Sequence, residues 1–382
     1  MRFLGFSLAA ILFALAAFAH YGLFRLVLAR SAWAARHRTS VAIVVFLLAG
    51  LPLLRALSGL WSPLRLGGQL GLLWHLVLVS AAAVTVVVSG LARLATRRRA
   101  TDDAPPADPS KRDAIVGASA LAASTAVYGW GAAVNRRAFE ISELAVKIPR
   151  LSRALDGFTI VQLSDIHVGP LMDERELARV VASANALRPD LIVITGDIID
   201  AEKRWIEAGA RALSTLRARF GVVGVPGNHD HYTGLDAVRS GLARGGVDLL
   251  VNRGKTIAAS DGGIALLGVD DLYARRFGAG PDLARARAMV RPDLPTILLA
   301  HQPPFFDETE GHAIDLQLSG HTHGGQINPG FTPAKWVFQY VAGRYDRADG
   351  STLYVNRGLG VVGPPVRLGA PPELTKIVLA SG

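Results

Sequence analysis

The sequence predicts an α/β domain, in which two sheets pack together with helices outside, preceded by an N-terminal bundle of about four transmembrane helices. Half of the 382 residues are hydrophobic, and long apolar runs are confined to the N-terminal third. From about Glu140 onward, short apolar runs alternate with helical stretches, which is typical of an α/β domain. We therefore expect a transmembrane region at residues 1–139 and a second domain at residues 140–382.

Four apolar runs in the N-terminal third predict the membrane helices, because a helix needs about 20 apolar residues to cross the hydrocarbon core. The second run is short and contains Arg55, and the fourth is rich in small residues that let membrane helices pack closely. A polar, Pro-rich linker at residues 101–110 precedes the fourth run. The runs lie near residues 4–28, 41–60, 70–91 and 114–134.

The charge distribution predicts how the chain is oriented in a membrane. Residues 1–139 carry 15 Lys and Arg but only 4 Asp and Glu, and the basic residues concentrate in the first and third loops. Cytoplasmic loops carry the excess of Lys and Arg, so we expect a multi-pass protein of the cell membrane with an extracytoplasmic C-terminal domain. Alternatively, the fourth run is a cleaved export segment, which gives the same destination without the anchor. The loop residues are Arg30, Arg36, Arg38, Arg97, Arg98, Arg99, Lys111 and Arg112.

Composition excludes two classes of chemistry. The chain has no cysteine, which rules out disulfides and thiolate chemistry. Beyond residue 139 it carries 26 basic and 27 acidic residues, a balance that lacks the basic footprint of a nucleic-acid-binding domain. We therefore expect no nucleic-acid partner.

Five predicted strands in the second domain each end in a polar cluster. In open α/β sheets, ligands bind at the carboxyl ends of the strands. A helix after the first strand has Asp173 as its cap, with Glu176 completing a capping box, and a second helix is expected over Arg204–Arg219. The clusters are Asp165 and His167 after Phe158–Leu163, Asp197 after Leu191–Thr195, Asn228, His229 and Asp230 after Val222–Val225, His301 after Thr296–Ala300, and His321 and His323 after Leu316–Leu318. Further strands are expected at Val247–Val251, Thr256–Ala259, Ile264–Val269, Thr352–Asn356 and Lys376–Ala380.

The pair His321 and His323 is the centre of this pattern. Alternate residues of an extended chain point to the same side, so both imidazoles can reach one ion. Imidazole and carboxylate together suit divalent transition metals. Taken singly, a residue such as Asp165 or Asn228 is better explained as a cap or a turn residue. Five such clusters in one chain instead favour a shared metal site.

These clusters resemble, in type and order, the motifs of the calcineurin-like metallophosphoesterase superfamily. The residues that follow His323, together with the segment 354–360, are similar to the bacterial membrane-associated branch that includes the phosphodiesterases YkuE and YaeI. The resemblance implies a four-layer αββα sandwich and two divalent metal ions, Mn²⁺, Fe²⁺ or Zn²⁺. It also implies a ligand set: Asp165, His167 and His323 for the first ion, Asn228, His301 and His321 for the second, and Asp197 as the bridge.

The same resemblance implies the chemistry. The two ions lower the pKa of a shared water, which then attacks phosphorus. His229 follows the ligand Asn228 and is expected to face the substrate, where it protonates the leaving oxygen or binds a phosphoryl oxygen. Asp230 is expected to orient His229, since a carboxylate fixes an imidazole tautomer.

We therefore expect a membrane-anchored hydrolase of phosphoric esters, with diesters or pyrophosphates favoured over monoesters. The segment Phe331–Tyr340 contains Trp336 and Phe338, and amphipathic aromatics favour the membrane interface. A lipid-linked phosphoester substrate is consistent with this segment, as is a loop that folds on its own domain. The alternatives are a phosphomonoesterase, or a membrane metal-binding or sensor module without turnover.

Overall fold

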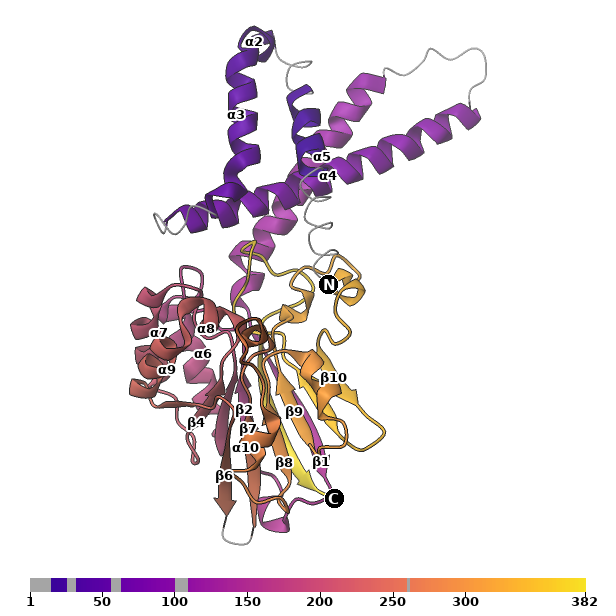
Figure 1. Cartoon of the computed structure of the whole chain (residues 1–382). Coiled ribbons are helices and arrows are strands. Elements are labelled where there is room, and N and C mark those ends of the chain that lie inside the picture. Colours follow the sequence, from indigo (N-terminus) through magenta and orange to yellow (C-terminus); the bar gives the residue numbers. More distant parts are fainter. Residues whose placement is uncertain (1–14, 26–31, 56–62, 100–108, 260–261) are drawn as a thin grey trace. The chain divides into compact units, whose positions relative to one another are not determined.

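The structure, a computed structural model, describes residues 15–25, 32–55, 63–99, 109–259 and 262–382. Contacts divide the chain into two units (Figure 1). The first is Met1–Ala133 with Gly363–Val366, and the second is Val134–Val362 with Arg367–Gly382.

The described residues of the first unit before Ala133 are almost entirely helical. Two helical stretches are long and apolar enough to cross a membrane, Leu64–Ala95 and Arg112–Arg137, and they match the third and fourth predicted spans. The second predicted span corresponds to a shorter apolar helix, Arg38–Leu53, and the rest of that run lies outside the described residues. Of the first predicted span, only residues 15–25 are described, and they are helical. The helices are α2 (Ala32–Arg36), α3 (Arg38–Gly50), η1 (Leu51–Arg55), α4 (Pro63–Arg99) and α5 (Pro109–Ala133).

Polar side chains join the two long helices of this unit. The hydroxyls of Ser80 and Tyr128 lie 2.9 Å apart, and Arg93 forms an ion pair with Asp113. The helix α5 begins at Pro109, so the predicted linker ends earlier than residue 110. Proline is favoured in the first turn of a helix because its missing N–H has no partner there.

The second unit contains two six-stranded mixed sheets. In the first sheet β2, β3, β4 and β5 are parallel, whereas β12 is antiparallel to β2 and parallel to β1. In the second sheet β7, β8, β9 and β11 are parallel, and β6 and β10 are antiparallel edge strands. The order of the first sheet is β1 (Glu140–Ile148), β12 (Glu373–Ser381), β2 (Thr159–Leu163), β3 (Leu191–Thr195), β4 (Val222–Val225) and β5 (Val247–Leu249). The order of the second is β10 (Gly343–Asp346), β11 (Thr352–Val355), β9 (Leu316–Ser319), β8 (Thr296–Leu299), β7 (Gly262–Gly268) and β6 (Arg253–Ala259).

The sheets pack face to face because their strands alternate between two cores. Ile160 of β2 joins the core between the sheets with Ile297 and Leu316 of the second sheet. Val161 and Leu163, which lie on the opposite face of the same strand, contact the helices instead. A further apolar cluster covers the outer face of the second sheet. The result is a sandwich with helices on both outer faces.

The helices of this unit differ in length and in the sheet against which they pack. The helices α6, α7 and α9 pack on the outer face of the first sheet, and α10 packs against the second. The α-helices are α6 (Glu174–Ala186), α7 (Ile206–Leu213), α8 (Asn228–Thr233), α9 (Leu235–Arg244) and α10 (Leu283–Arg287). The 3-10 helices are η2 (Asn135–Arg137), η3 (Arg153–Leu155), η4 (Lys203–Trp205), η5 (Leu272–Phe277), η6 (Pro303–Thr309), η7 (His323–Gly325) and η8 (Pro333–Trp336).

Local structure departs from prediction at two helices. Asp173 caps α6 through the backbone N–H groups of Arg175 and Glu176, as predicted. The Glu176 carboxylate, however, forms ion pairs with two arginines of η2, Arg136 and Arg137. The helix expected over Arg204–Arg219 is also shorter, because α7 ends at Leu213. The next two residues bond their hydroxyls back to helix carbonyls, a competition that disfavours helix.

Candidate metal centre

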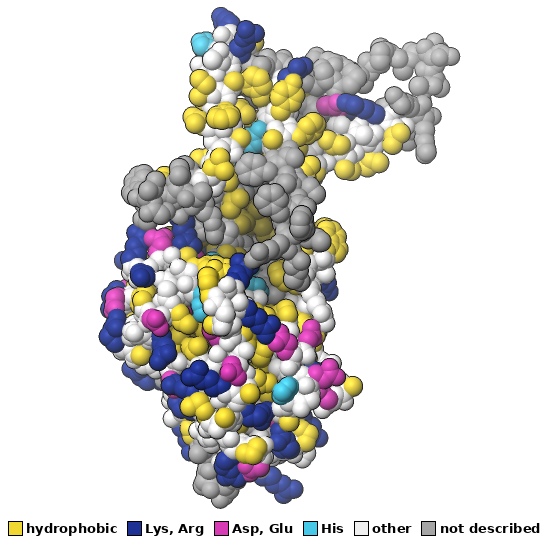
Figure 2. Space-filling view, viewed as in Figure 1, with side chains coloured by type: hydrophobic (Ala, Val, Ile, Leu, Met, Phe, Trp, Pro, Cys, Tyr) yellow, Lys and Arg dark blue, Asp and Glu magenta, His cyan; other side chains and the backbone are white. Residues whose placement is uncertain are grey.

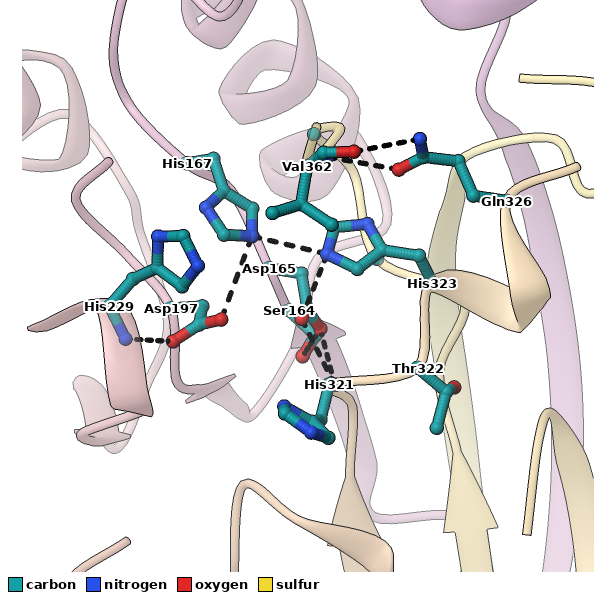
Figure 3. Close-up of polar contacts among 12 residues, drawn as sticks. Ser164, Asp165, His167, Asp197, His229, His321, Thr322, His323, Gln326 and Val362 are labelled. Carbon is teal, nitrogen blue, oxygen red and sulfur yellow. Dashed lines mark hydrogen bonds and ion pairs between the residues drawn. The ribbon is translucent and has the colours of Figure 1, made fainter. Parts of the chain in front are cut away.

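The five predicted polar clusters meet at one place. The strands β2, β3 and β4 of the first sheet and β8 and β9 of the second end beside one another, and the segment after each strand carries the predicted residues. The structure thus brings together six of the seven predicted metal ligands as well as His229, and Asn228, the seventh, directly precedes His229 in the chain. Figure 3 shows Asp165, His167, Asp197, His229, His321 and His323 at this place. Because five separate strands contribute to it, this site exists only when the two sheets are packed together.

The backbone at the site is held in a conformation that residues other than glycine rarely adopt. Five candidate residues have a positive φ: Asp165, His167, Asp197, His321 and His323, at 48°, 50°, 50°, 72° and 52°. Such residues cost of order 1–3 kcal/mol each and cluster at functional sites. Close approach also requires Gly320, where a Cβ would collide with the Ser164 hydroxyl.

The first group of candidate ligands is Asp165, His167 and His323. The two imidazole Nε2 atoms lie 3.1 Å apart, and His323 Nε2 is 3.4 Å from Asp165 Oδ1. Figure 3 shows the two rings facing each other above the Asp165 carboxylate. That carboxylate accepts hydrogen bonds from the Ser164 hydroxyl at 2.6 Å and from the backbone N–H of His321 at 3.0 Å. The second sheet therefore fixes a carboxylate of the first.

The second group contains Asp197, His301 and His321, with Asn228 nearby. His301 Nε2 lies 3.2 Å from His321 Nδ1 and 3.3 Å from Asp197 Oδ2. His301 Nδ1 donates to the Thr195 carbonyl oxygen at 2.7 Å, which directs Nε2 toward the other ligands. Burial works to lower the pKa of His301, but the Asp197 carboxylate outweighs it and raises that pKa well above the ordinary value.

Asp197 lies between the two groups. Its Oδ1 accepts from the backbone N–H of His229 at 2.7 Å, and its Oδ2 is 3.3 Å from His301 Nε2 and 3.6 Å from His167 Nε2. Burial works to raise the pKa of this carboxyl, but His301 and His229 outweigh it and hold the pKa well below its ordinary value. Asp197 is therefore an anion in contact with both sets of histidines, as a bridging ligand must be.

The donor set fits metal ions. Asn228 Oδ1 is buried and has no hydrogen-bond partner among the described residues. Burial lowers the pKa of His167 to about 4 and of His321 to about 3, so both imidazoles are neutral and can offer a lone pair to a cation. Three groups of residues have donor atoms within 4.8 Å of one another, which is close enough to share an ion. Nitrogen and oxygen donors of this kind bind Mn²⁺, Fe²⁺ or Zn²⁺.

His229 stands beside both groups, but its carboxylate neighbour differs from the predicted one. Its Nδ1 is 3.3 Å from Asp200 Oδ1. Asp230 is fully buried and accepts instead from the backbone N–H groups of Gly227, Ile198 and Ile199. Neighbouring residues of a helix point about 100° apart, so the first turn of α8 directs the Asp230 side chain away from the His229 ring. Asp230 therefore holds the turn, whereas Asp200, three residues after Asp197, is the carboxylate beside the His229 ring.

Arg367 is a further residue of this site that sequence reasoning missed. Its guanidinium is fully buried, and burial lowers its pKa to about 9. One Nη atom lies 3.1 Å from His323 Nδ1, and the other donates to the carbonyl oxygens of His323 and Arg357 at 2.8 Å. Further bonds reach Gly358 and Gly360, in the loop that passes over Asp165. Arg367 thus ties a candidate metal ligand to this loop.

Comparison with known proteins gives a consistent picture. Residues 158–325 match the family described as calcineurin-like phosphoesterase. The chain is 37% identical to the uncharacterized metallophosphoesterase YkuE of Bacillus subtilis, over 70% of this chain and 95% of that protein. It is 33% identical to a transmembrane protein with metallophosphoesterase domain of Danio rerio, over 76% of this chain and 67% of that protein.

Other matches are partial. The chain is 37% identical to a transmembrane protein with metallophosphoesterase domain of Bos taurus, but it spans only 56% of the length of that relative. Among solved structures, TT1561 of Thermus thermophilus has a TM-score of 0.38 at 16% identity, over 53% of this chain and 90% of that one. With the YkuE match, the sandwich fold and the motif residues gathered at one site, the chain belongs to the calcineurin-like metallophosphoesterase family, whose members use a two-metal site.

Proposed function

We propose that this protein is a membrane-anchored, two-metal phosphoesterase that hydrolyses phosphodiesters or pyrophosphates. The observation that carries the proposal is the position of Asp197. One of its oxygens faces histidines of both candidate metal groups, and the other fixes the backbone of His229. This arrangement suits two cations and an adjacent proton donor, which together are the requirements of metal-assisted ester hydrolysis.

Asp165, His167 and His323 would hold one cation, Asn228, His301 and His321 the other, and Asp197 would bridge them. When bound, the cations would lower the pKa of a water and stabilise negative charge on the phosphoryl oxygens. Hydroxide forms a new bond to phosphorus while the bond from phosphorus to the leaving oxygen breaks. That oxygen keeps the electron pair and takes a proton.

His229 is the residue we assign to protonate the leaving oxygen. Burial works to lower its pKa, but Asp197 and Asp200 outweigh it and raise the pKa above the ordinary value for histidine. A raised pKa favours the protonated imidazole, which is the form that a general acid requires. Asp200 would position the ring through Nδ1, which leaves Nε2 for the substrate.

The preference for diesters is supported by the charge of the site. Arg367 contacts the candidate ligand His323, but its donors are engaged by that imidazole and by backbone carbonyls, so it offers none to a substrate. A monoester dianion gains more from such a cation than a diester monoanion does. On the face of the domain shown in Figure 2, basic and acidic side chains are interspersed, in keeping with a substrate other than nucleic acid.

The proposed substrate is lipid-linked, and the segment 331–340 supports this. Trp336 is 77% and Phe331 54% exposed, with ring centroids 5.6 Å apart. Phe338, in the same segment, lies edge-on to His321 with 6.2 Å between ring centroids. Exposed aromatics of this kind favour a membrane interface. A lipid substrate could therefore contact this segment while its phosphate reaches the metal centre.

The primary test is hydrolysis by the full chain in detergent, stripped of metal and reconstituted with Mn²⁺. We expect turnover of bis-p-nitrophenyl phosphate that exceeds turnover of p-nitrophenyl phosphate and is lost in Asp197→Asn and His229→Ala. A preference for the monoester would move the assignment to a phosphomonoesterase. Two bound metals without turnover of either ester would favour a binding or sensor module.

The proposal that the substrate is lipid-linked is tested with the double variant Trp336→Ala and Phe331→Ala. We expect slower hydrolysis of a lipid phosphodiester in mixed micelles and unchanged hydrolysis of bis-p-nitrophenyl phosphate. Met289→Ala, which also removes an exposed apolar side chain, is the matched control. Equal rates on both substrates in the double variant would exclude a lipid-contacting role for the segment.

The proposed location is the extracytoplasmic side of the cell membrane. The two candidate spans and the basic residues between them, Arg97, Arg98, Arg99 and Lys111, support this orientation. A reporter that is active only in the cytoplasm, fused after Gly382, is expected to be inactive. Reporter activity would reverse the orientation.

A further inference from the structure

A row of three aromatic rings begins at His229 and runs outward to the surface. Tyr232 lies next to His229, with ring centroids 5.0 Å apart. Tyr273 packs edge-on against Tyr232 at 4.8 Å, and Phe277 packs against Tyr273 at 5.5 Å. The rings come from α8 and η5, two short helices that contact each other. This aromatic row therefore forms a wall that is continuous with the candidate catalytic residue.

The aromatic row is open to solvent at both of its ends. Tyr232 is 48% exposed and Phe277 is 72% exposed. Large aromatic side chains are usually buried, and a contiguous exposed group of them marks a binding surface more often than a random feature. The inner end is also tied to the metal centre, because the Tyr232 side chain interacts with Asn228. Position and exposure together indicate that the row receives part of the substrate.

A cation lies over the middle of the row. The guanidinium of Arg276 sits 4.9 Å from the centre of the Tyr273 ring. Within the described part of the chain, no carboxylate lies in salt-bridge range of Arg276, whereas its neighbour Arg275 pairs with Glu308 at 2.5 Å. A guanidinium that stacks on a ring keeps its N–H edge available for an anion. The surface therefore offers both flat apolar faces and a cation that has no carboxylate partner among the described residues.

We propose that Tyr232, Tyr273 and Phe277 form the subsite for the leaving group, that this group is aromatic, and that Arg276 binds an acidic substituent on it. The inference rests on the proposed function, in which His229 gives its proton to the leaving oxygen. Whatever is attached to that oxygen must extend from His229, and the aromatic row begins there. Edge-to-face rings accept a flat ring, and a guanidinium selects an anion, so the chemistry fits an acidic aryl group better than an alkyl chain.

The experiment compares diesters that differ only in the leaving group, using the full chain in detergent with Mn²⁺. Methyl phenyl phosphate expels phenol, methyl 4-carboxyphenyl phosphate expels an acidic phenol, and dimethyl phosphate expels an alcohol. The variants are Tyr273→Leu, Phe277→Ala and Arg276→Gln. Arg219→Gln is the matched control, because that guanidinium also lies 4.9 Å over a ring, that of Phe220.

The expected result is a loss that depends on the leaving group. Tyr273→Leu and Phe277→Ala should lower kcat/KM roughly tenfold for both aryl esters and leave the alkyl ester unchanged. Arg276→Gln should lower kcat/KM for the carboxyphenyl ester alone. The control should change none of the three, and each variant should keep the thermal melting temperature of the parent.

Two results would overturn the inference, and they differ from failure of the proposed function. Equal losses on aryl and alkyl esters, or no loss on any, would show that the row does not hold the leaving group, while diester hydrolysis by the parent chain would stand. If the parent chain hydrolysed no diester at all, both proposals would fall. Phe277→Ala keeps the test decisive if Tyr273→Leu fails to fold, because the Phe277 ring is largely outside the core.

Discussion

The two sheets contribute different chemistry to the site. The ends of the first sheet supply the carboxylates of both candidate ligands of this type, Asp165 and Asp197, and that of Asp200, together with Asn228 and two histidines. The ends of the second supply only imidazoles. Each half is also held by the other, since the backbone N–H of His321 binds Asp165 and the Thr195 carbonyl oxygen accepts from His301.

This difference indicates which side chains serve both candidate metal positions and which serve only one. The negative charge that cations require belongs to one sheet, whereas the neutral ligands that complete their coordination belong to the other. Changes at Asp197 should therefore affect both halves at once. A change at a residue that orients one ligand or the proton donor should affect only the function of that ligand or donor.

The largest effect is expected for Asp197→Asn. Loss of the shared anion should lower kcat/KM roughly a thousandfold and remove both metal ions, because this side chain faces the histidines of both groups. Metal content per chain and diester hydrolysis measure the two effects. Asp236→Asn, at an exposed carboxylate, is the control. Retention of one metal in Asp197→Asn would mean that the two halves bind independently.

Arg367→Met should affect the two candidate metal positions differently. The variant should weaken the first metal roughly a hundredfold through His323 and leave the second, which His301 and His321 would hold, close to its parent affinity. It should also lower the free energy of unfolding by at least about 3 kcal/mol, because buried carbonyls lose their donors. Metal titration of each variant provides the measurement, with Arg367→Lys as a partial rescue. A uniform loss of both metals would argue for a purely structural role.

Asp200→Asn should act chiefly on the proton donor, because Asp200 Oδ1 lies 3.3 Å from His229 Nδ1 and 3.8 Å from Nδ1 of the candidate ligand His167. The raised pKa of His229 means that activity falls as pH rises through that value, when the imidazole loses its proton. Without Asp200 the pKa is lower, so the descending limb of the pH profile should move to lower pH, and kcat should drop roughly tenfold. Metal content should remain that of the parent chain. An unshifted profile would remove Asp200 from the mechanism.

His231→Gln should give the smallest effect, on stability. His231 Nε2 lies 2.7 Å from Asp270 Oδ1, and although burial works to lower its pKa, this bond raises it above 6.5. The stabilisation is then complete below 6.5 and is lost as pH rises through the raised value. The free energy of unfolding should fall by about 1 kcal/mol in the variant near pH 5.5 and by less near pH 9. An equal fall at both pH values would mean that the pair is not ionised.

Apolar patterning predicted most of the second unit. The strands β3 and β4 begin and end where their apolar runs do, and the polar residue after each run lies at the site. The strand β1 was missed because its residues alternate with Glu140, Glu143 and Lys147, a pattern that carries little hydrophobic signal. For the membrane spans, length and composition support two of the four predictions, and most of the first span lies outside the described residues.

The residues missed at the site share a cause. Asp200 and Arg367 do not bind the predicted ions, so no ligand motif marks them. Their roles depend on which side chains the fold places within reach. Asp230 was assigned to His229 because the two are adjacent in sequence, but adjacency along a helix separates side chains in space. Orienting contacts of this kind require coordinates.

The position of β12 has a consequence for how the protein is made. This strand, the last to leave the ribosome among those described, inserts between β1 and β2. Until it arrives, both neighbours present unpaired edges, and the first sheet is divided. A nascent chain that stops short of Glu373 therefore cannot close the sheet on which Asp165 depends. Chains that lack β12 should therefore be inactive, and their open sheet edges should make them susceptible to proteolysis.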